Sequence, residues 1–285
     1  LFPYTTLFRS SVDSYFSVLM RVGLAALVFL PFLRTRGQSP RTIVLYMLVG
    51  AMQLGIMYLL AFRAYIYLTV SEFLLFTVFT PLYITLIYDL LSGRKLRWGY
   101  LLSAALAVLG AAIIRYDKVS DHFWTGLLLV QLSNLCFAIG MVGYKRLMEV
   151  RPMPQHNAFA WFYVGAFIVA VAAWFMLGNA QKLPTTTLQW SVLVWLGVVA
   201  SGLGYFMWNY GATQVDAGTL GIMNNVHVPA GLLVNLAIWQ EQPHWPSFIS
   251  GALVILASLW VHRRWVAPHS GQTADDRRRG SAHSE

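Results

Sequence analysis

The chain has 285 residues, of which 58% are hydrophobic and only 11% are charged. A soluble domain carries about 25% charged residues, so this composition excludes a globular protein in water and places most of the surface in lipid. The formal net charge of +9 does not indicate nucleic-acid binding, because the basic residues stand in short clusters between apolar runs. A single cysteine excludes a disulfide framework and a thiolate metal site, and the sequence predicts no cofactor and no metal.

Apolar runs long enough to cross a membrane fill the chain from Phe16 to His262. A helix needs about 20 mostly apolar residues to cross the hydrocarbon core. The sequence therefore predicts an all-α integral membrane protein, a polytopic helical bundle of about nine spans. In chain order these are roughly Phe16–Leu33, Ile43–Phe62, Tyr65–Leu91, Trp98–Ile114, Trp124–Tyr144, Asn157–Leu177, Leu188–Asn209, Ala217–Trp239 and Trp245–His262.

The two ends of the chain do not fit this pattern. Residues 1–15 are a non-conforming segment, neither a signal peptide, for want of a sustained apolar stretch, nor a full span. Residues 267–285 are rich in Ser, Gly, Arg and Asp and show no apolar periodicity. We expect them to form a disordered cytoplasmic tail.

The spanning pattern occurs twice along the chain. A shift of about 147 positions brings landmarks of one half onto those of the other. The matched pairs are Gly50 with Gly197, Tyr58 with Tyr205, Trp98 with Trp245 and Ser103 with Ser250, and with one residue of slippage Pro81 with Pro229. Internal repeats of this kind are typical of secondary transporters, whose substrate site lies between the repeats near the middle of the membrane.

The repeat divides the chain into two unequal halves. We predict a first repeat over residues 16–116 with four spans and a second over residues 122–264 with five. Complete halves of five helices would be inverted relative to one another, because five is odd. The first helix of the first repeat is then expected to be missing, with residues 1–10 foreign or misread. A natural nine-span protein is the alternative.

Basic residues mark one side of the predicted bundle. If every span crosses once, the clusters Arg34–Arg41, Arg94–Arg97, Lys145–Arg151 and Arg263–Arg264 all fall on the same side. The connections on the other side are nearly neutral or acidic. By the positive-inside rule the clusters face the cytoplasm. We therefore expect a multi-pass protein of the cytoplasmic (inner) membrane with a cytoplasmic C-terminus.

Three stretches, Leu19–Pro31, Thr80–Ala111 and Pro229–Ala257, resemble the EamA domain of the drug/metabolite transporter (DMT) superfamily. In that family each half ends with a proline-containing helix, a short turn that typically carries Gly-Glu, and a final helix with small residues. Glu241 occupies the turn position of the second half, whereas the first half departs from the pattern with Gly93-Arg94. The resemblance implies a ten-helix secondary transporter, an exporter or facilitator of small metabolites such as amino acids, that works by alternating access.

Polar residues inside predicted spans are candidates for a substrate cavity, because unpaired they are costly in lipid. In the helix Ala217–Trp239, Asn224, His227 and Asn235 share one face at helical spacing. Amides and an imidazole suit a water-filled cavity. Hydrogen bonds that hold the bundle together are the alternative.

The helix Tyr65–Leu91 carries Glu72, Phe76, Phe79 and Tyr83 on one face, a carboxylate followed by an aromatic ladder. This face suits an amino or aromatic group in a cavity. The alternative is that Glu72 lies near the outer membrane face and meets interfacial water or a basic residue.

Pro81 and Pro229 stand at matching depth in these two helices. Each removes a backbone donor and frees a carbonyl, which predicts a kink that serves as a hinge or a polar contact. Asn134, Tyr205 and Trp208 are further cavity candidates, for which packing is an equal alternative. Ser201 shares the face of Tyr205 and Trp208, and Asn209 is adjacent. Arg21, early in the first span, is interpreted as interfacial or paired.

The remaining partners follow from this interpretation: a small-molecule substrate, the lipid bilayer, and either a monomer or a homodimer. Glu72 and His227 are titratable groups suited to proton coupling, and a simple facilitator is equally consistent.

Other function classes fit less well. A channel or receptor does not need two inverted halves. An intramembrane aspartyl protease needs a second carboxylate, but no Gly-x-Gly-Asp follows Tyr88-Asp89, and the residue two before Ser201 is Val199 rather than the small residue expected of a serine protease. No Walker motif is present, so ATP does not drive transport within this chain. The sequence predicts a transporter and not an enzyme.

Overall fold

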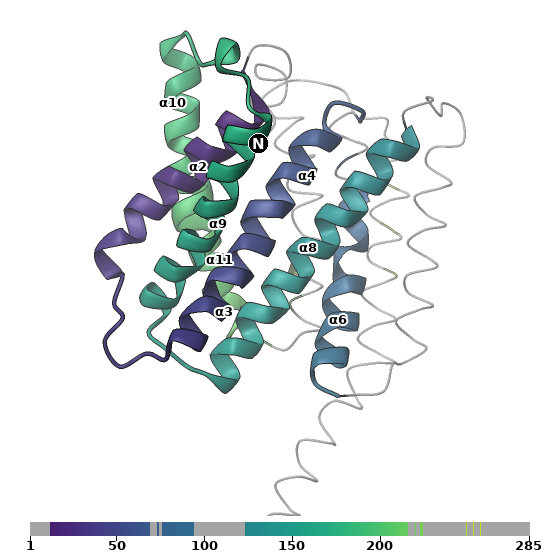
Figure 1. The fold of residues 1–285 in the computed structure, drawn as a ribbon. Coiled ribbons are helices and arrows are strands. Elements are labelled where there is room, and N and C mark those ends of the chain that lie inside the picture. Colours follow the sequence, from purple (N-terminus) through teal and green to yellow (C-terminus); the bar gives the residue numbers. More distant parts are fainter. Residues whose placement is uncertain are drawn as a thin grey trace, which may run out of the picture.

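A computed structural model describes residues 12–68, 73, 76–93 and 123–215, together with positions 220, 223, 224, 249, 253 and 257. Within these residues the regular structure is helical (Figure 1). Five of the described helices are long and apolar enough to cross a membrane: Ser14–Phe32, Pro40–Ala64, Trp124–Val150, Gln155–Leu177 and Thr187–Ala212. Thr80–Leu91 is a shorter apolar helix. The predicted span Trp98–Ile114 lies outside the described residues, as do most of Ala217–Trp239 and Trp245–His262.

The spans are assembled from shorter helical elements. The first is α2 (Ser14–Phe29), which continues into a 3₁₀ turn, η1 (Leu30–Phe32). The second joins α3 (Pro40–Gly50), η2 (Ala51–Ile56) and α4 (Met57–Ala64). After these come η3 (Thr77–Phe79), α6 (Thr80–Leu91), α8 (Phe123–Val150) and α9 (Gln155–Leu177). Following the short 3₁₀ turn η4 (Ala180–Lys182), the last described span joins α10 (Thr187–Trp195), η5 (Leu196–Gly204) and α11 (Tyr205–Ala212).

Side chains outside the apolar runs fix where several helices begin. The Asp13 carboxylate accepts a hydrogen bond from the Phe16 amide at 2.9 Å, and Ser39 accepts one from Thr42 in front of Pro40. Thr186 and Gln189 form a capping box at α10. Because these caps satisfy amides that have no partner within the helix, the observed spans start a few residues before the apolar runs.

The predicted helix Tyr65–Leu91 is not regular throughout. The turn after α4 includes Tyr65, and the 3₁₀ turn η3 precedes α6, which carries Pro81 in its first turn. Since Pro81 has no amide to donate, the Thr77 carbonyl accepts instead from the Thr80 amide, three residues on. The interruption lies where the kink is predicted.

The two described spans that join three elements each contain a π-helical segment, η2 and η5, in mid-span. The shift of about 147 positions that relates the two halves carries residues 51–56 onto 198–203, inside η5. π-helical turns are rare in proteins, and those that occur often lie at functional sites. Their matching positions indicate that the two halves share this irregularity.

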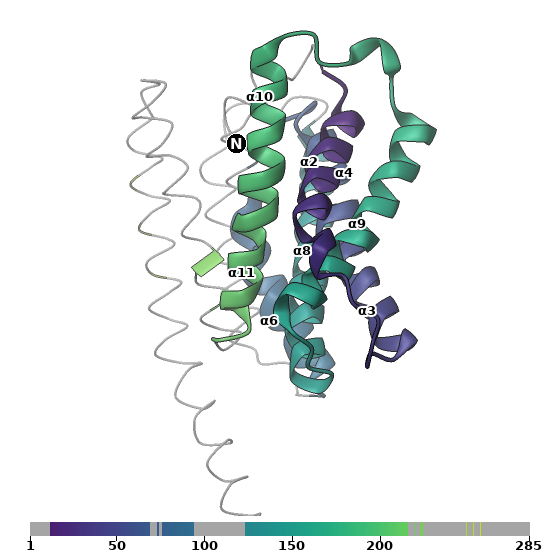
Figure 2. The ribbon, with the colours of Figure 1, turned by 90° about the vertical axis from the view of Figure 1, so that its left-hand side faces the viewer.

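Most of the described helices pack side by side in a row, and the α10–η5–α11 span packs against this row (Figure 1). α2 lies beside α9, α9 beside α3, α4 beside α8, and α8 beside α6 (Figure 1). The α10–η5–α11 span runs beside α2 in the perpendicular view and contacts it mainly through η5 (Figure 2). Fully buried aromatic rings fill the interior between α3, α8 and α9: Tyr46, Tyr144, Phe159, Phe162 and Tyr163.

Two basic clusters lie at one end of this bundle. Arg151, after α8, donates to the Thr42 hydroxyl at 3.1 Å, which ties its segment to the start of α3. At the opposite end, the Asp13 amide donates to the Lys182 carbonyl at 2.8 Å. The clusters around 34–41 and 145–151 therefore share a side, as the charge pattern predicts.

Two glycines allow the backbones of α3 and α9 to come into direct contact. A Cβ atom at Gly50 would overlap the Phe162 carbonyl oxygen, and one at Gly165 would overlap that of Met47. The backbones of α3 and α9 meet at these two points, as small residues allow between spanning helices.

We expect Gly50→Ala and Gly165→Ala each to lower the free energy of unfolding by about 1–3 kcal/mol, because the added methyl group forces the two backbones apart. Thermal unfolding in detergent micelles measures this. Gly211→Ala is the matched control, since a Cβ there meets nothing within 4 Å. Equal melting temperatures for all three variants would show that the contact does not hold the bundle together.

Candidate functional site

A charged side chain lies buried in the middle of the first span. Arg21 on α2 is only 2% exposed. Its Nε donates to Ser201 Oγ at 3.1 Å, and its Nη2 donates to Ser201 Oγ at 3.0 Å and to the Tyr58 hydroxyl at 2.9 Å. The two hydroxyls are themselves 3.2 Å apart. We call Arg21, Tyr58 and Ser201 the polar centre.

Aromatic rings surround the polar centre. The Arg21 Cζ atom lies 4.5 Å from the centroid of the Tyr58 ring, a cation–π distance. Tyr205, a predicted cavity residue, meets Tyr58 edge to face at 6.0 Å. Tyr163 on α9 donates its hydroxyl to the Ser201 carbonyl. The polar centre therefore binds together elements of both halves, and Arg21 and Ser201 are 180 positions apart.

Close backbone approach makes these contacts possible. A Cβ atom at Gly197 would lie 2.8 Å from the Leu24 Cβ and 3.4 Å from the Arg21 Cα. Because Gly197 has no side chain, η5 lies against α2 closely enough for the short Ser201 side chain to reach the guanidinium.

The polar centre lies near mid-membrane. At 1.5 Å of rise per residue, Arg21 is roughly 10 Å along the helix from Ser14 and roughly 16 Å from Phe32. A hydrocarbon core is about 30 Å thick, so a span of this length places Arg21 well inside it. The hydrogen bonds of Arg21 agree with one of the two interpretations made from sequence, that it is paired.

A second polar contact joins the two spans that contain π-helical segments. Gln53 on η2 donates its amide to the Asn209 Oδ1 at 3.2 Å, and Asn209 Nδ2 donates to the Tyr205 carbonyl at 3.1 Å. Both amide side chains are fully buried. The two halves thus also meet through an amide pair.

A third group links α6 to α8. Asn134 donates to the Phe76 carbonyl at 2.9 Å, and Gln131 donates to the same oxygen at 3.3 Å. The Tyr83 hydroxyl donates to Gln131 Oε1 at 3.0 Å. The carbonyl that accepts two amides belongs to the residue just before η3, so the irregular backbone beside Pro81 is held by side chains of α8.

The structure brings several predicted cavity residues together. Phe76 and Phe79 are buried in one apolar cluster with Val130, and Tyr83 packs against it. Tyr83 also joins Trp208 in the neighbouring cluster around Ile84. The Trp208 Nε1 atom is buried there without a hydrogen-bond partner among the described residues.

Other predicted residues are placed differently or not described. Asn224 is buried. Glu72, His227, Asn235 and the hinge candidate Pro229 lie outside the described residues.

Sequence reasoning did not select Tyr58 as a cavity residue, whereas Ser201 was placed on the candidate face of Tyr205 and Trp208, with Asn209 beside it. The repeat held a signal for Tyr58, because it matches Tyr205 and the two rings are in contact. The local pattern places Ser201 on this face but does not predict its contact with Arg21 in the other half.

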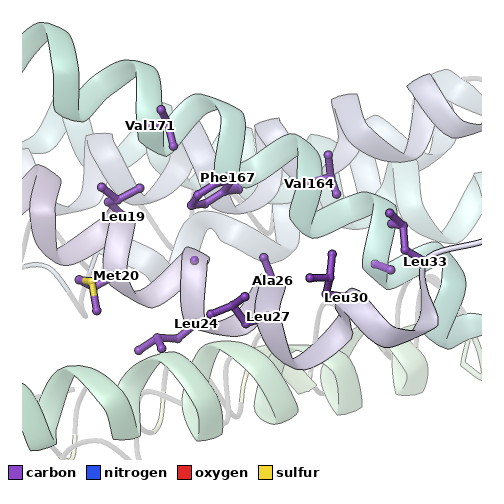
Figure 3. Close-up of a pocket in the computed structure, with 12 residues that line it drawn as sticks. Leu19, Met20, Leu24, Ala26, Leu27, Leu30, Leu33, Val164, Phe167 and Val171 are labelled. Carbon is purple, nitrogen blue, oxygen red and sulfur yellow. The ribbon is translucent and has the colours of Figure 1, made fainter.

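An open groove of about 450 Å³ between α2 and α9 has a different character (Figure 3). Its lining is entirely apolar: Leu19, Met20, Gly23, Leu24, Ala26, Leu27, Leu30, Leu33, Ala160, Val164, Phe167 and Val171. Without a polar group it suits hydrocarbon and offers nothing to fix the orientation of a polar solute.

The sequence model of the EamA-like transporter family matches residues 1–116 and 124–263. The chain belongs to the EamA-like transporter family. The resemblance noted from sequence is thereby confirmed, and the protein is a multi-pass membrane transporter rather than an enzyme.

Relatives carry more specific names. The chain is 82% identical over 274 residues to the "Biotin transporter" of Escherichia coli (strain K12), which covers 96% of this chain and 92% of that protein. The "Biotin transporter" of Salmonella typhimurium is 82% identical over the same shares. The "Probable biotin transporter" of Pseudomonas aeruginosa is 54% identical over 254 residues, 88% of each chain. None of these three names refers to amino acids, which the family resemblance suggested as an example of the substrate.

A solved structure, titled "Crystal structure of protein", resembles this one with a TM-score of 0.68 over 91% of both chains. At 17% identity this likeness shows the fold alone.

We expect Asn134→Ala to lower the free energy of unfolding by roughly 0.6–1.7 kcal/mol, which lies between the average and the maximum measured for hydrogen bonds between spanning helices. The reason is that the Phe76 carbonyl loses the shorter of its two hydrogen bonds from α8 and keeps the longer one, from Gln131. Thermal unfolding measures the change, with Gln214→Ala, an exposed amide at the end of a helix, as control. An effect no larger than the control's would mean that the contact is not stabilising.

Proposed function

We propose that this protein transports biotin across the cytoplasmic membrane. The observation that carries the proposal is the 82% identity, over 96% of the chain, to proteins named biotin transporters. Biotin takes the place of the amino acids suggested by the family in general. At this identity about four residues in five are the same, so a change of substrate would have to arise from the remaining fifth.

The chemistry of biotin agrees with the residues around the described polar groups. Biotin combines a compact ring system that carries a urea and a thioether with a flexible chain that ends in a carboxylate. Rings of Tyr205 and Trp208 suit the fused rings, and amides such as Asn134 both donate and accept, as a urea requires.

We include in the proposed cavity all the residues selected from sequence: Glu72, Phe76, Phe79, Tyr83, Asn134, Tyr205, Trp208, Asn224, His227 and Asn235. They come from both repeats, as alternating access between inverted halves requires. Proton coupling through Glu72 or His227 and a simple facilitator remain alternatives within this proposal. The charge pattern supports a cytoplasmic C-terminus.

Counterflow tests the substrate independently of direction and driving force. Proteoliposomes loaded with unlabelled biotin are diluted into a trace of labelled biotin. We expect transient accumulation of label above the level in protein-free liposomes, and no accumulation when the internal solute is an amino acid. Accumulation with amino acids but not with biotin would overturn the proposal.

The hinge at Pro81 is tested by restoring the missing amide. We expect Pro81→Ala to slow biotin exchange several-fold, because the new donor can extend the regular hydrogen bonds of α6 through η3 and stiffen the interruption. Pro40→Ala is the matched control, since Pro40 stands at the start of α3, where no backbone donor is needed. Exchange at the wild-type rate in Pro81→Ala would remove the hinge from the mechanism.

A further inference from the structure

We infer that Arg21 binds the carboxylate of the transported molecule and that the hydroxyls of Tyr58 and Ser201 orient the Arg21 guanidinium. The inference rests on the proposed function. It adds which group of the substrate is recognised and which side chain recognises it. The relatives' names specify neither.

The place of Arg21 supports this role. Substrate sites of transporters built from inverted repeats lie near mid-membrane, at the interface of the repeats. Arg21 meets both conditions, because it lies about halfway along α2 and contacts Ser201 on the second half. A cation at this depth is costly and is most often part of a substrate or ion pathway.

The chemistry of the polar centre points to an anion with two oxygens. A guanidinium is a planar fork of donors that matches a carboxylate, and such charge-assisted pairs are stronger than neutral ones. Tyr58 and Ser201 accept hydrogen bonds from Arg21. Both are hydroxyls that can also donate, so they orient the guanidinium and can turn their own hydrogens toward a carboxylate.

The supports of these hydroxyls suggest how binding and movement are connected. Ser201 lies within η5, and Tyr58 follows η2 by two residues, so each is carried by a span with a widened turn. The Arg21–Ser201 contact joins the two halves directly. A carboxylate that takes the place of Ser201 on the guanidinium would keep Arg21 satisfied while the halves separate. Without an anion, the same separation would take the Ser201 acceptor away from a buried charge.

Competition on the wild-type protein is the first test. Purified protein binds labelled biotin, and unlabelled compounds displace it. We expect desthiobiotin, which keeps the carboxylate, to compete well. Biotin methyl ester and biotin amide are expected to bind at least about tenfold more weakly, because each lacks the charged hydrogen-bond partner of Arg21.

Variants then assign the preference to Arg21. We expect Arg21→Gln to reduce the preference for biotin over its methyl ester to near unity, and Arg21→Lys to keep part of it. Tyr58→Phe and Ser201→Ala retain the Arg21 cation, and we expect each to reduce the affinity for biotin several-fold more than the affinity for the methyl ester. Arg36→Gln, an exposed arginine in the loop after η1, is the control. The ratio of the two affinities is the decisive readout, because a purely structural role would weaken both ligands equally.

The outcomes separate the two proposals. Failure of the wild-type protein to bind biotin would overturn the proposed function and this inference with it. Equal affinity of the wild type for biotin and its methyl ester would overturn the inference alone. If Arg21→Gln does not fold, the wild-type competition and the Tyr58→Phe and Ser201→Ala ratios still decide the question, and unchanged ratios in both would count against the polar centre.

Discussion

The burial of one charge in the middle of a membrane is the constraint on which the described structure depends. A guanidinium at this depth is stable only if other elements bring hydrogen-bond partners to it. Arg21 therefore requires α4 to supply Tyr58 and η5 to supply Ser201, and Gly197 is needed so that η5 approaches α2 closely enough. The contact between the halves is in this sense a consequence of where the charge lies. The amide pair Gln53–Asn209 adds a second, uncharged contact, which joins the spans that carry Tyr58 and Ser201.

The division between polar interior and apolar exterior gives the transporter two kinds of surface. The groove between α2 and α9 is lined by apolar side chains, while the opposite contacts of α2, toward η5 and α4, carry the guanidinium and the hydroxyls. A carboxylate with an apolar body is suited to the second kind of surface and not to the first. The π-helical segments η2 and η5 lie within the spans that form this interior. Because these segments occupy equivalent positions in the two halves, bending at both of them would preserve the symmetry of the pair.

Much of the fold was predictable because lipid imposes a simple rule on sequence. The spans along α2, α3–α4, α8, α9 and α10–α11 follow from apolar length alone, with ends displaced by caps such as Asp13 and Ser39. The irregularity before Pro81 followed from the missing amide. The π-helical segments could not be foreseen, since one extra residue in a turn does not change the count of apolar residues. Nor could the polar centre, because the importance of Arg21 lies in a partner 180 positions away. The match of Tyr58 with Tyr205 was the signal that sequence offered and that local reasoning left unused.

The central claim is that the transported molecule binds with its carboxylate at the polar centre between the two halves. Photolabelling tests it most directly, with a biotin analogue that keeps its carboxylate and carries a diazirine on the adjoining chain, followed by mass spectrometry of the labelled peptides. The account predicts label on the segments around Arg21, Tyr58 and Ser201, displaced by unlabelled biotin. Label confined to the apolar groove of α2 and α9, or label that biotin does not displace, would contradict it.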